Sequence, residues 1–453
     1  MLPTAYLGLT LFIIFFELTR TKDTKFDFLS LFHLFFILLY SLPGYFITDL
    51  TNLSERVIDP SDYGLTTYNV QHNYQVLIAI FLTYALVIAG FYAASAQDYG
   101  SRIILTSKSD KAIWRIALGI LFIGLGSIIV YSSQYGGVVQ AVLQANLIRA
   151  GAVERGALGF FIKFVYFNFF AAYLIASLLF MRKKQQGRTL LWLLLVIAVA
   201  SSLIAAFMVS ARATMILAFA NFYLAYLLYK RKLALPIILP LLFVTVLFII
   251  YGKAFFYSLS GFSEGGYIEA FSRFQDATQS KTDNSFISNL MRVFSYGFIS
   301  TNAAFQENYT LRLLGDWISG FASFMPDKII KIDIANNVSK DNSIFLLGHS
   351  DYTIPTGFIA SCVYSWSWAG VILFSFFYGW LGRFIQTVLQ RHLYQIFWTP
   401  FVYVVIAQAW SDFLASGDPE IFLETNFWIL TSLGFLLLFG MRISIARKNR
   451  EIV

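Results

Sequence analysis

Long apolar runs alternate with short polar segments along almost the whole chain. The runs extend over about 18 to 22 residues, the length that an α-helix needs to cross a hydrocarbon core about 30 Å thick. The predicted spans are 2–19, 28–50, 76–95, 115–133, 159–181, 189–209, 213–229, 233–252, 355–381, 397–415 and 421–441. The pattern therefore predicts an all-α polytopic membrane protein of about eleven transmembrane helices, with residues 1–453 forming a single integral membrane domain.

The first run, Leu2 to Leu18, has the hydropathy of a signal peptide but not its charges. A signal peptide begins with a positively charged region and ends at a cleavage site of small residues. Here no charged residue precedes Glu17, and the first basic residues, such as Arg20, follow the run. We predict a retained helix whose N-terminus faces outward.

The distribution of Lys and Arg among the loops predicts the orientation, because short loops rich in these residues stay in the cytoplasm. If the odd-numbered helices run from outside to inside, the inner segments hold 20 of the 33 basic residues. Most of the others lie in one long segment, 253–354, and long segments are exempt from the rule. We predict an N-out, C-in topology with this segment as a large outer loop. The net charge of +8 is then a topology signal and requires no nucleic acid partner.

Composition excludes several classes of protein. Charged residues make up 13% of the chain, against about a quarter in soluble proteins. The single cysteine, Cys362, cannot form a disulfide within the chain. The predicted inner loops are short and carry no glycine-rich phosphate-binding loop. We therefore expect neither a nucleotide-driven motor within this chain nor a bound cofactor.

Three predicted outer segments are large enough to build a site, namely 51–75, 132–158 and 253–354. The long loop contains two pieces of its own. Residues 287–305 have apolar positions at helical spacing with Arg292 on the polar side, and residues 311–324 are apolar enough to lie in the membrane interface. We expect any chemistry on this outer face.

Arg212 is the most informative single residue, because it lies in the almost uninterrupted apolar stretch FMVSARATMILAF. The chain is predicted to turn there at the outer surface, where an arginine costs a few kcal/mol unless it snorkels or binds an anion. Snorkelling explains one isolated arginine, but Arg149, Arg155 and Arg292 lie on the same predicted side. The guanidinium group binds phosphate or carboxylate through two parallel hydrogen bonds. These residues therefore predict a site for an anionic headgroup, such as a lipid-linked diphosphate.

His349 precedes a predicted transmembrane helix in the stretch FLLGHSDYTIPTG. It is either an ordinary loop histidine bonded to Asp351, or a base or sugar ligand at the membrane edge. The four histidines are scattered along the chain, and no HxxxH, CxxC or outer-loop DxD motif accompanies them. We predict no metal site.

Three stretches follow one another in a recognisable order. Residues 136–151 read GGVVQAVLQANLIRAG, residues 210–217 read SARATMIL, and residues 347–379 run from LGHSDYTIPTG to the FSFFYG of a helix. In these stretches, in length, in helix count and in the late outer loop, the chain resembles the bacterial oligosaccharide repeat-unit polymerases of the Wzy type. These enzymes build O-antigen, capsule and exopolysaccharide. Two details differ from the family pattern: residues 357–361 lack a glutamate, and the spacing of glycine after Arg149 is different.

The resemblance implies a GT-C-like fold and metal-independent glycosyl transfer on the periplasmic face of the bacterial inner membrane. The donor and the acceptor would both be oligosaccharides linked to undecaprenyl diphosphate, within membrane lipid. A chain-length-determinant protein and a flippase would be further partners. By the same resemblance, the diphosphate would be bound by Arg149, Arg155, Arg212 and Arg292. Catalysis would fall to Arg149, Arg212 and His349, with Asp351 or Glu154 as alternative bases.

Two other functions remain open from the sequence. An O-antigen ligase uses the same lipid-linked donor, the same membrane side and the same arginine chemistry. A transporter or flippase of lipid-linked sugars would carry charged residues deep within several helices and inverted repeats. The predicted spans are nearly free of charge and the two halves of the chain differ in loop architecture, which favours the polymerase. A purely structural membrane protein would leave the outer arginines unexplained.

Overall fold

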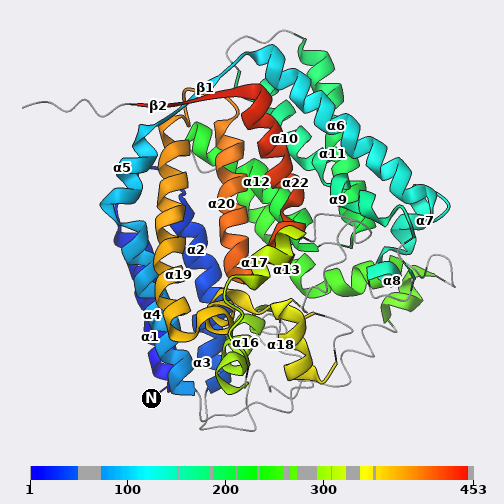
Figure 1. Ribbon diagram of the computed structural model, residues 1–453. Helices are drawn as coiled ribbons and strands as arrows, with labels where there is room; N and C mark the ends of the chain where they lie inside the picture. The colour runs from blue at the N-terminus through cyan, green and yellow to red at the C-terminus, as the bar shows by residue number, and fades with distance from the viewer. Residues whose placement is uncertain are drawn as a thin grey trace, which may run out of the picture. The chain divides into compact units, whose positions relative to one another are not determined.

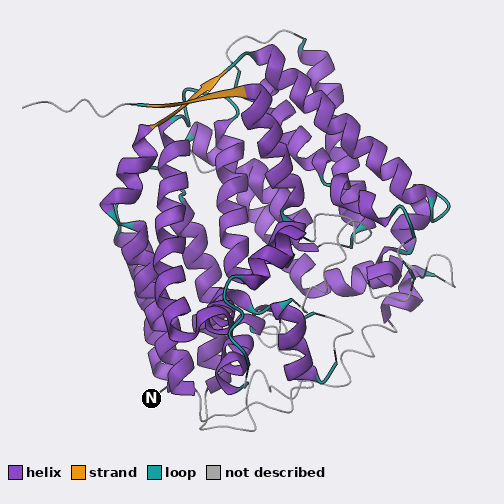
Figure 2. Ribbon diagram, in the orientation of Figure 1, coloured by secondary structure: helices purple, strands orange, loops and turns teal. Residues whose placement is uncertain are grey.

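The structure is a computed structural model, shown in Figure 1. It describes residues 2–48, 73–149, 153–154, 156–182, 187–210, 212–231, 235–259, 261, 266–272, 293–307, 309–322, 337–349 and 353–446. Helices make up nearly all of this part of the chain, and Figure 2 shows the one pair of strands beside them. The chain is a multi-pass membrane protein by the length and hydropathy of its helices.

A helix occupies most of each predicted apolar run. Within the described residues, segments long and apolar enough to cross a membrane are Leu2–Thr19, Phe28–Thr48, Tyr74–Phe91, Asp110–Ser133, Gly159–Phe180, Arg188–Met208 and Gly357–Arg391. Pro419–Thr425 and Phe427–Gly440 form an eighth span if this pair, bent by 60°, is counted as one. Shorter apolar helices cover Thr214–Lys230 and Ile238–Phe248. The seven or eight spans confirm the multi-pass all-α class, and the total of about eleven stays a prediction.

The chain forms two compact units, each assembled from non-contiguous segments. Unit 1 comprises Met1–Ser101, Asp283–Thr387 and Ala407–Asn426, and unit 2 comprises Arg102–Thr282, Val388–Ile406 and Phe427–Val453. The helices of unit 1 are α1 (Leu2–Thr19), α2 (Phe28–Phe36), η1 (Ile37–Ser41), α3 (Leu42–Thr48), α4 (Asn73–Phe91), α5 (Ala94–Arg102), α16 (Tyr296–Gln306), α17 (Gly315–Ala322), α18 (Val338–Leu347), most of α19 (Gly357–Arg391) and α21 (Pro419–Thr425). Helix α20 (Thr399–Ser416) contributes residues to both units.

Unit 2 contains the remaining elements. They are β1 (Ile103–Ser107), α6 (Asp110–Ser133), α7 (Val138–Leu143), α8 (Ala145–Arg149), η4 (Gly159–Phe161), α9 (Ile162–Val165), α10 (Phe167–Phe180), α11 (Arg188–Met208), α12 (Arg212–Lys230), α13 (Leu235–Ser258), α22 (Phe427–Phe435), η6 (Leu436–Gly440) and β2 (Met441–Ile445).

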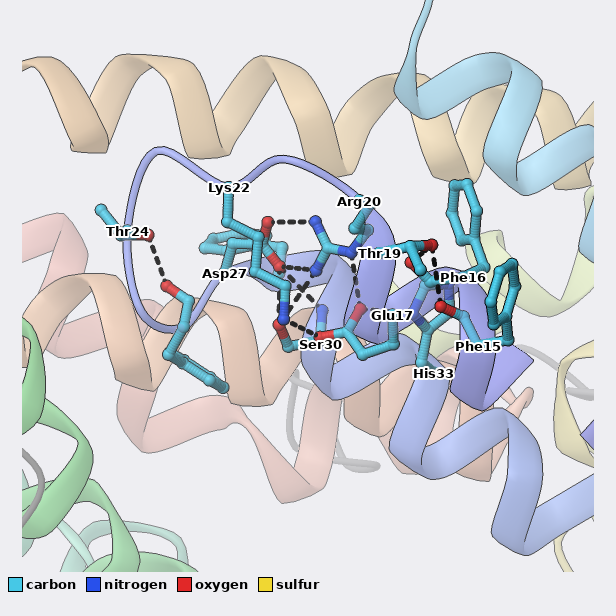
Figure 3. A network of polar contacts seen from close by, with 12 residues as sticks. Phe15, Phe16, Glu17, Thr19, Arg20, Lys22, Thr24, Asp27, Ser30 and His33 are labelled. Carbon is cyan, nitrogen blue, oxygen red and sulfur yellow. Dashed lines mark hydrogen bonds and ion pairs between the residues drawn. The ribbon is translucent and has the colours of Figure 1, made fainter. Parts of the chain in front are cut away.

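Charged side chains meet where α1 is joined to α2 in unit 1 (Figure 3). The Arg20 guanidinium donates to the two carboxylate oxygens of Asp27 at 2.5 and 2.6 Å and to Glu17 at 2.6 Å. Only 4% of the Arg20 side chain is exposed. Asp27 also accepts a hydrogen bond from the Ser30 backbone N–H and so caps α2, and the His33 ring bonds to Glu17. Arg20, one of the basic residues behind the predicted topology, is thus also a buried structural residue.

Helices α4 and α19 of unit 1 cross at two glycines. A Cβ atom at Gly90 would collide with the carbonyl of Phe376, and a Cβ atom at Gly379 would collide with the carbonyl of Val87. Small residues allow helix backbones to approach closely, which favours helix association in a membrane. This crossing therefore depends on both positions having no side chain.

Replacing Gly379 with leucine is expected to destabilise the protein by about 1–3 kcal/mol, because overpacking forces a backbone shift. The measurement is the midpoint of thermal unfolding in detergent. Gly434→Leu is the matched control, since a Cβ atom at Gly434 meets no atom within 4 Å. Equal midpoints for the two variants would contradict the close crossing.

The predicted outer loop contributes described helices to unit 1. Helix α16 differs from the expectation of an amphipathic piece over 287–305, because residues 297–304 are all buried and the helix belongs to the core. Helix α17 keeps Ile318 and Phe321 exposed, and the interfacial position of 311–324 stays a prediction.

A break in α19 explains one contact of this loop. Trp366 and Ser367 have non-helical backbone angles, so carbonyls of the preceding turn lose their helical partners. The Tyr309 hydroxyl and the backbone N–H groups of residues 312–313 donate to the carbonyls of residues 363–365. Backbone groups at membrane depth must be satisfied by protein, since lipid offers no partner. The loop therefore stabilises the broken helix.

In unit 2, α10 packs between α6 and α11, and its residues are almost all buried. At one end of these helices β1 and β2 pair antiparallel, from Ile103 opposite Ile445 to Ser107 opposite Met441. The all-α prediction did not include this pair. His392 supports it, because its Nε2 accepts a hydrogen bond from the Leu105 backbone N–H and its Nδ1 lies 2.8 Å from a backbone carbonyl. His392 is therefore a structural histidine.

Candidate anion-binding site

The end of unit 2 away from the strand pair is built by the segment that follows α6. Gly136 and Gly137 turn the chain with φ of +87° and +113°, conformations that favour glycine. Helices α7 and α8 follow, and α8 ends at Arg149. Ala141 of α7 belongs to the same buried cluster as Met208 of α11. This packing fixes the segment carrying Arg149 against the end of α11.

Arg149 reaches the turn between α11 and α12. Its Nη1 donates a hydrogen bond of 2.6 Å to the backbone carbonyl of Ser210. Ser210 has a φ of +51°, which is uncommon for a residue with a side chain. Helix α12 begins two residues later at Arg212. The fold thus brings the Arg149 guanidinium beside the turn that carries Arg212.

Tyr166, at the junction of α9 and α10, lies near the start of α12. Its hydroxyl is buried, and its electrostatic neighbours are the Thr214 hydroxyl and the charge of Arg149. Ser210 and Thr214 flank Arg212 in sequence. Arg149 and Tyr166 therefore meet the chain on both sides of Arg212, in one small region of unit 2.

The charge of Arg149 has no acidic partner among the described residues. Three other arginines there are neutralised: Arg20 pairs with Glu17 and Asp27, Arg182 with Asp110, and Arg312 with Asp316 and Asp341. Arg149 bonds instead to a neutral carbonyl and is exposed. An exposed guanidinium without a carboxylate partner has N–H groups left to donate to an anion.

The predicted site residues divide between the two units and the undescribed part of the chain. In unit 2, Arg149 contacts the Ser210 carbonyl, two residues before Arg212. Arg155, Arg292 and Asp351, together with the side chain of Arg212, lie outside what the structure describes. His349 lies in unit 1, directly after the Gly348 that caps α18. Glu154 is described in unit 2 and is exposed.

Arg312, another arginine of the predicted outer face, has a structural role in unit 1. Burial lowers its pKa, but hydrogen bonds to Asp316 and the charges of Asp316 and Asp341 outweigh that effect and raise the pKa overall. Nearby, burial raises the pKa of the Glu307 carboxyl, and the hydrogen bond that it accepts from the Tyr364 hydroxyl at 2.9 Å offsets this only in part. An anion would gain little from Arg312, since its charge is already compensated.

Within the described part of the chain, no group of three or more His, Cys, Asp or Glu side chains is placed to hold a metal ion. No family model matches the chain, and no curated protein or solved structure matches it either.

No sequence pattern singles out Ser210 or Tyr166. Ser210 lies within the quoted stretch around Arg212, but its left-handed backbone has no local signature such as a glycine or asparagine. Tyr166 lies inside an apolar run, FFIKFVYFNFF, where one more aromatic residue predicts a core position. Only the antiparallel packing of α6, α10 and α11 brings these residues to Arg149.

Proposed function

We propose that this protein polymerises oligosaccharide repeat units linked to undecaprenyl diphosphate. The observation that supports the proposal most is the Arg149 guanidinium, which has no acidic partner among the described residues and lies beside the turn that begins α12 at Arg212. An arginine beside a turn that carries a second arginine suits a diphosphate, because each guanidinium group can donate two parallel hydrogen bonds to phosphate oxygens. The resemblance in the stretches 136–151, 210–217 and 347–379 supplies the substrate class.

In the proposed reaction, a hydroxyl oxygen of the acceptor sugar forms a bond to the anomeric carbon of the donor. The bond from that carbon to the diphosphate oxygen breaks, and the acceptor proton passes to a base. Negative charge develops on the departing diphosphate, so positive groups aimed at it lower the barrier most. Arg149 and Arg212 take that role, and Arg155 and Arg292 are further proposed ligands. As the base, the resemblance implies His349, which belongs to unit 1, with Asp351 and Glu154 as alternatives.

The proposed setting follows the sequence-based topology. The protein would lie in the bacterial inner membrane with about eleven spans, N-out and C-in, and a GT-C-like fold. The large loop over 253–354 and the arginine turn would face the periplasm, where a flippase delivers the substrate. A chain-length-determinant protein would act on the product.

The test is reconstitution in liposomes with undecaprenyl-diphosphate-linked oligosaccharide as donor and acceptor. We expect glycan ladders on the lipid and release of undecaprenyl diphosphate. Arg212→Ala should insert and fold normally but form no polymer. Normal long-chain polymer from that variant would refute the assignment.

Two further arms separate the other functions. Transfer of glycan to lipid A core, with no ladder on the lipid, would identify a ligase. Movement of labelled lipid-linked sugar between leaflets without glycan transfer would identify a flippase.

A further inference from the structure

Several polar atoms at the end of α6 and in the turn that Arg149 contacts are buried without a hydrogen-bond partner among the described residues. They are the amide oxygen and nitrogen of Gln134, the hydroxyl of Tyr135 and the hydroxyl of Ser210. Ser210 is only 3% exposed. Buried polar groups in native proteins are nearly always paired with protein, water or a ligand, because leaving them unpaired costs free energy. Four such atoms in one region point to a binding partner.

These atoms belong to one neighbourhood. Ser210 provides the carbonyl that accepts the hydrogen bond from Arg149. Tyr135 packs against the same buried cluster as Val209, the residue before Ser210. Gln134 precedes Tyr135 at the end of α6, and a Cβ atom at Gly156 would lie 2.5 Å from its amide oxygen. Gly156 therefore lies directly against the Gln134 amide.

The chemistry of this neighbourhood differs from that of the arginine beside it. The Gln134 amide offers two donor hydrogens and an acceptor, and each hydroxyl both donates and accepts. The groups carry no charge, and aromatic rings lie next to them, with Tyr131 and Tyr135 ring centroids 5.3 Å apart. A neutral, hydroxyl-rich group directly bonded to an anion matches such a surface. A sugar linked to phosphate has this structure.

We propose that Gln134, Tyr135 and Ser210 bind the sugar that is attached directly to the diphosphate of the lipid-linked donor. The inference rests on the proposed function, because that function supplies the lipid-linked sugar diphosphate. Arg149 holds the phosphate, and the three uncharged side chains recognise the first sugar ring. Because both interactions contribute, the site binds undecaprenyl diphosphate that still carries glycan more tightly than the undecaprenyl diphosphate released by the reaction.

Binding measurements on the full-length protein in nanodiscs test the proposal separately from polymer formation. The probes are undecaprenyl diphosphate alone and undecaprenyl diphosphate carrying one sugar. Tyr135→Phe and Gln134→Met should each weaken binding of the sugar-bearing lipid about 10-fold or more, because a site built to bond hydroxyls loses its partner. Binding of undecaprenyl diphosphate alone should stay within about twofold. Arg149→Ala should weaken both, and Gln140→Met, an exposed glutamine on α7, should weaken neither.

Equal effects of Tyr135→Phe on the two lipids, or no effect on either, would overturn the proposal. A second readout is the thermal stability of the ligand-free protein. The Tyr135 hydroxyl lacks a described protein partner, so Tyr135→Phe should leave the unfolding midpoint unchanged or raise it. A lowered midpoint would mean that the hydroxyl bonds within the protein and would also refute the proposal. Discrimination between the two lipids without any ladder would instead refute the polymerase function and leave the sugar site standing.

Discussion

Replacing Arg149 with alanine is expected to reduce the rate of polymer formation at least about 100-fold, the size of effect seen when one group that stabilises a developing anion is removed. The variant should still fold, because Arg149 contributes one hydrogen bond to the Ser210 carbonyl and no ion pair within the described residues. Arg149→Lys keeps the charge but loses the forked geometry, so its rate should fall between those of the wild type and the alanine variant. The measurement is ladder formation by purified protein at saturating lipid-linked substrate.

The matched control is Arg231→Ala. Arg231 lies in the same unit, stacks on Tyr394 and is exposed, and the charge pattern assigns it to the inner face. Its removal should leave the rate within about twofold, as for a surface charge away from the chemistry. Wild-type ladders from Arg149→Ala would remove Arg149 from the mechanism. A similar loss in both variants would show that the effect is one of general charge and not of site.

Replacing Arg20 with methionine is expected to lower the free energy of unfolding by about 3–5 kcal/mol, the cost of leaving a buried charge without its partner. Methionine fills a similar volume, so the loss reports on the charges of Glu17 and Asp27, both of which Arg20 neutralises (Figure 3). The measurement is unfolding in mixed micelles, followed by tryptophan fluorescence. Lys22 and Lys25 keep the positive charge from which a cytoplasmic loop is predicted, so the orientation should not change.

Two companion variants separate charge from packing. Lys22→Ala removes a more exposed partner of Glu17 and should cost less than about 1 kcal/mol, as most surface ion pairs do. Arg20→Met combined with Asp27→Asn removes charge of both signs and should recover part of the lost stability. If Arg20→Met alone unfolds like the wild type, the network in Figure 3 contributes little to stability.

The contrast between Arg20, Arg312 and Arg149 shows where sequence reasoning about charges ends. All three occur next to apolar segments, and the charge pattern assigns Arg20 to the inner face and the other two to the outer face. The structure pairs Arg20 and Arg312 with carboxylates, and gives Arg149 a carbonyl instead. Asp27 and Asp316 lie within a few residues of their arginines, but nearness in sequence does not reveal whether two side chains point toward each other. Pairing depends on the direction of the side chains after the helices have packed.

Helix positions were predictable for a different reason. Whether a segment crosses a membrane depends mainly on its own length and hydropathy, so local composition located a helix in each predicted run. The break at Trp366 and Ser367 was not predictable, because the carbonyls it frees are satisfied by residues 309–313, which are distant in sequence. The burial of α16 was missed for the same reason: its neighbours come from other parts of the chain.

The sequence by itself therefore determined the multi-pass helical class, because each membrane-spanning segment must be apolar along its own length. It also drew attention to Arg149 and Arg212, because arginine is rare in apolar surroundings. Only the tertiary structure decided that Arg149 meets the turn before Arg212, and that Gln134, Tyr135 and Ser210 present unpaired polar atoms beside it. These relations arise from the packing of α6, α10 and α11, whose contacts join residues far apart in the chain. Hydrogen bonding and charge compensation are properties of such contacts, and no local pattern encodes them.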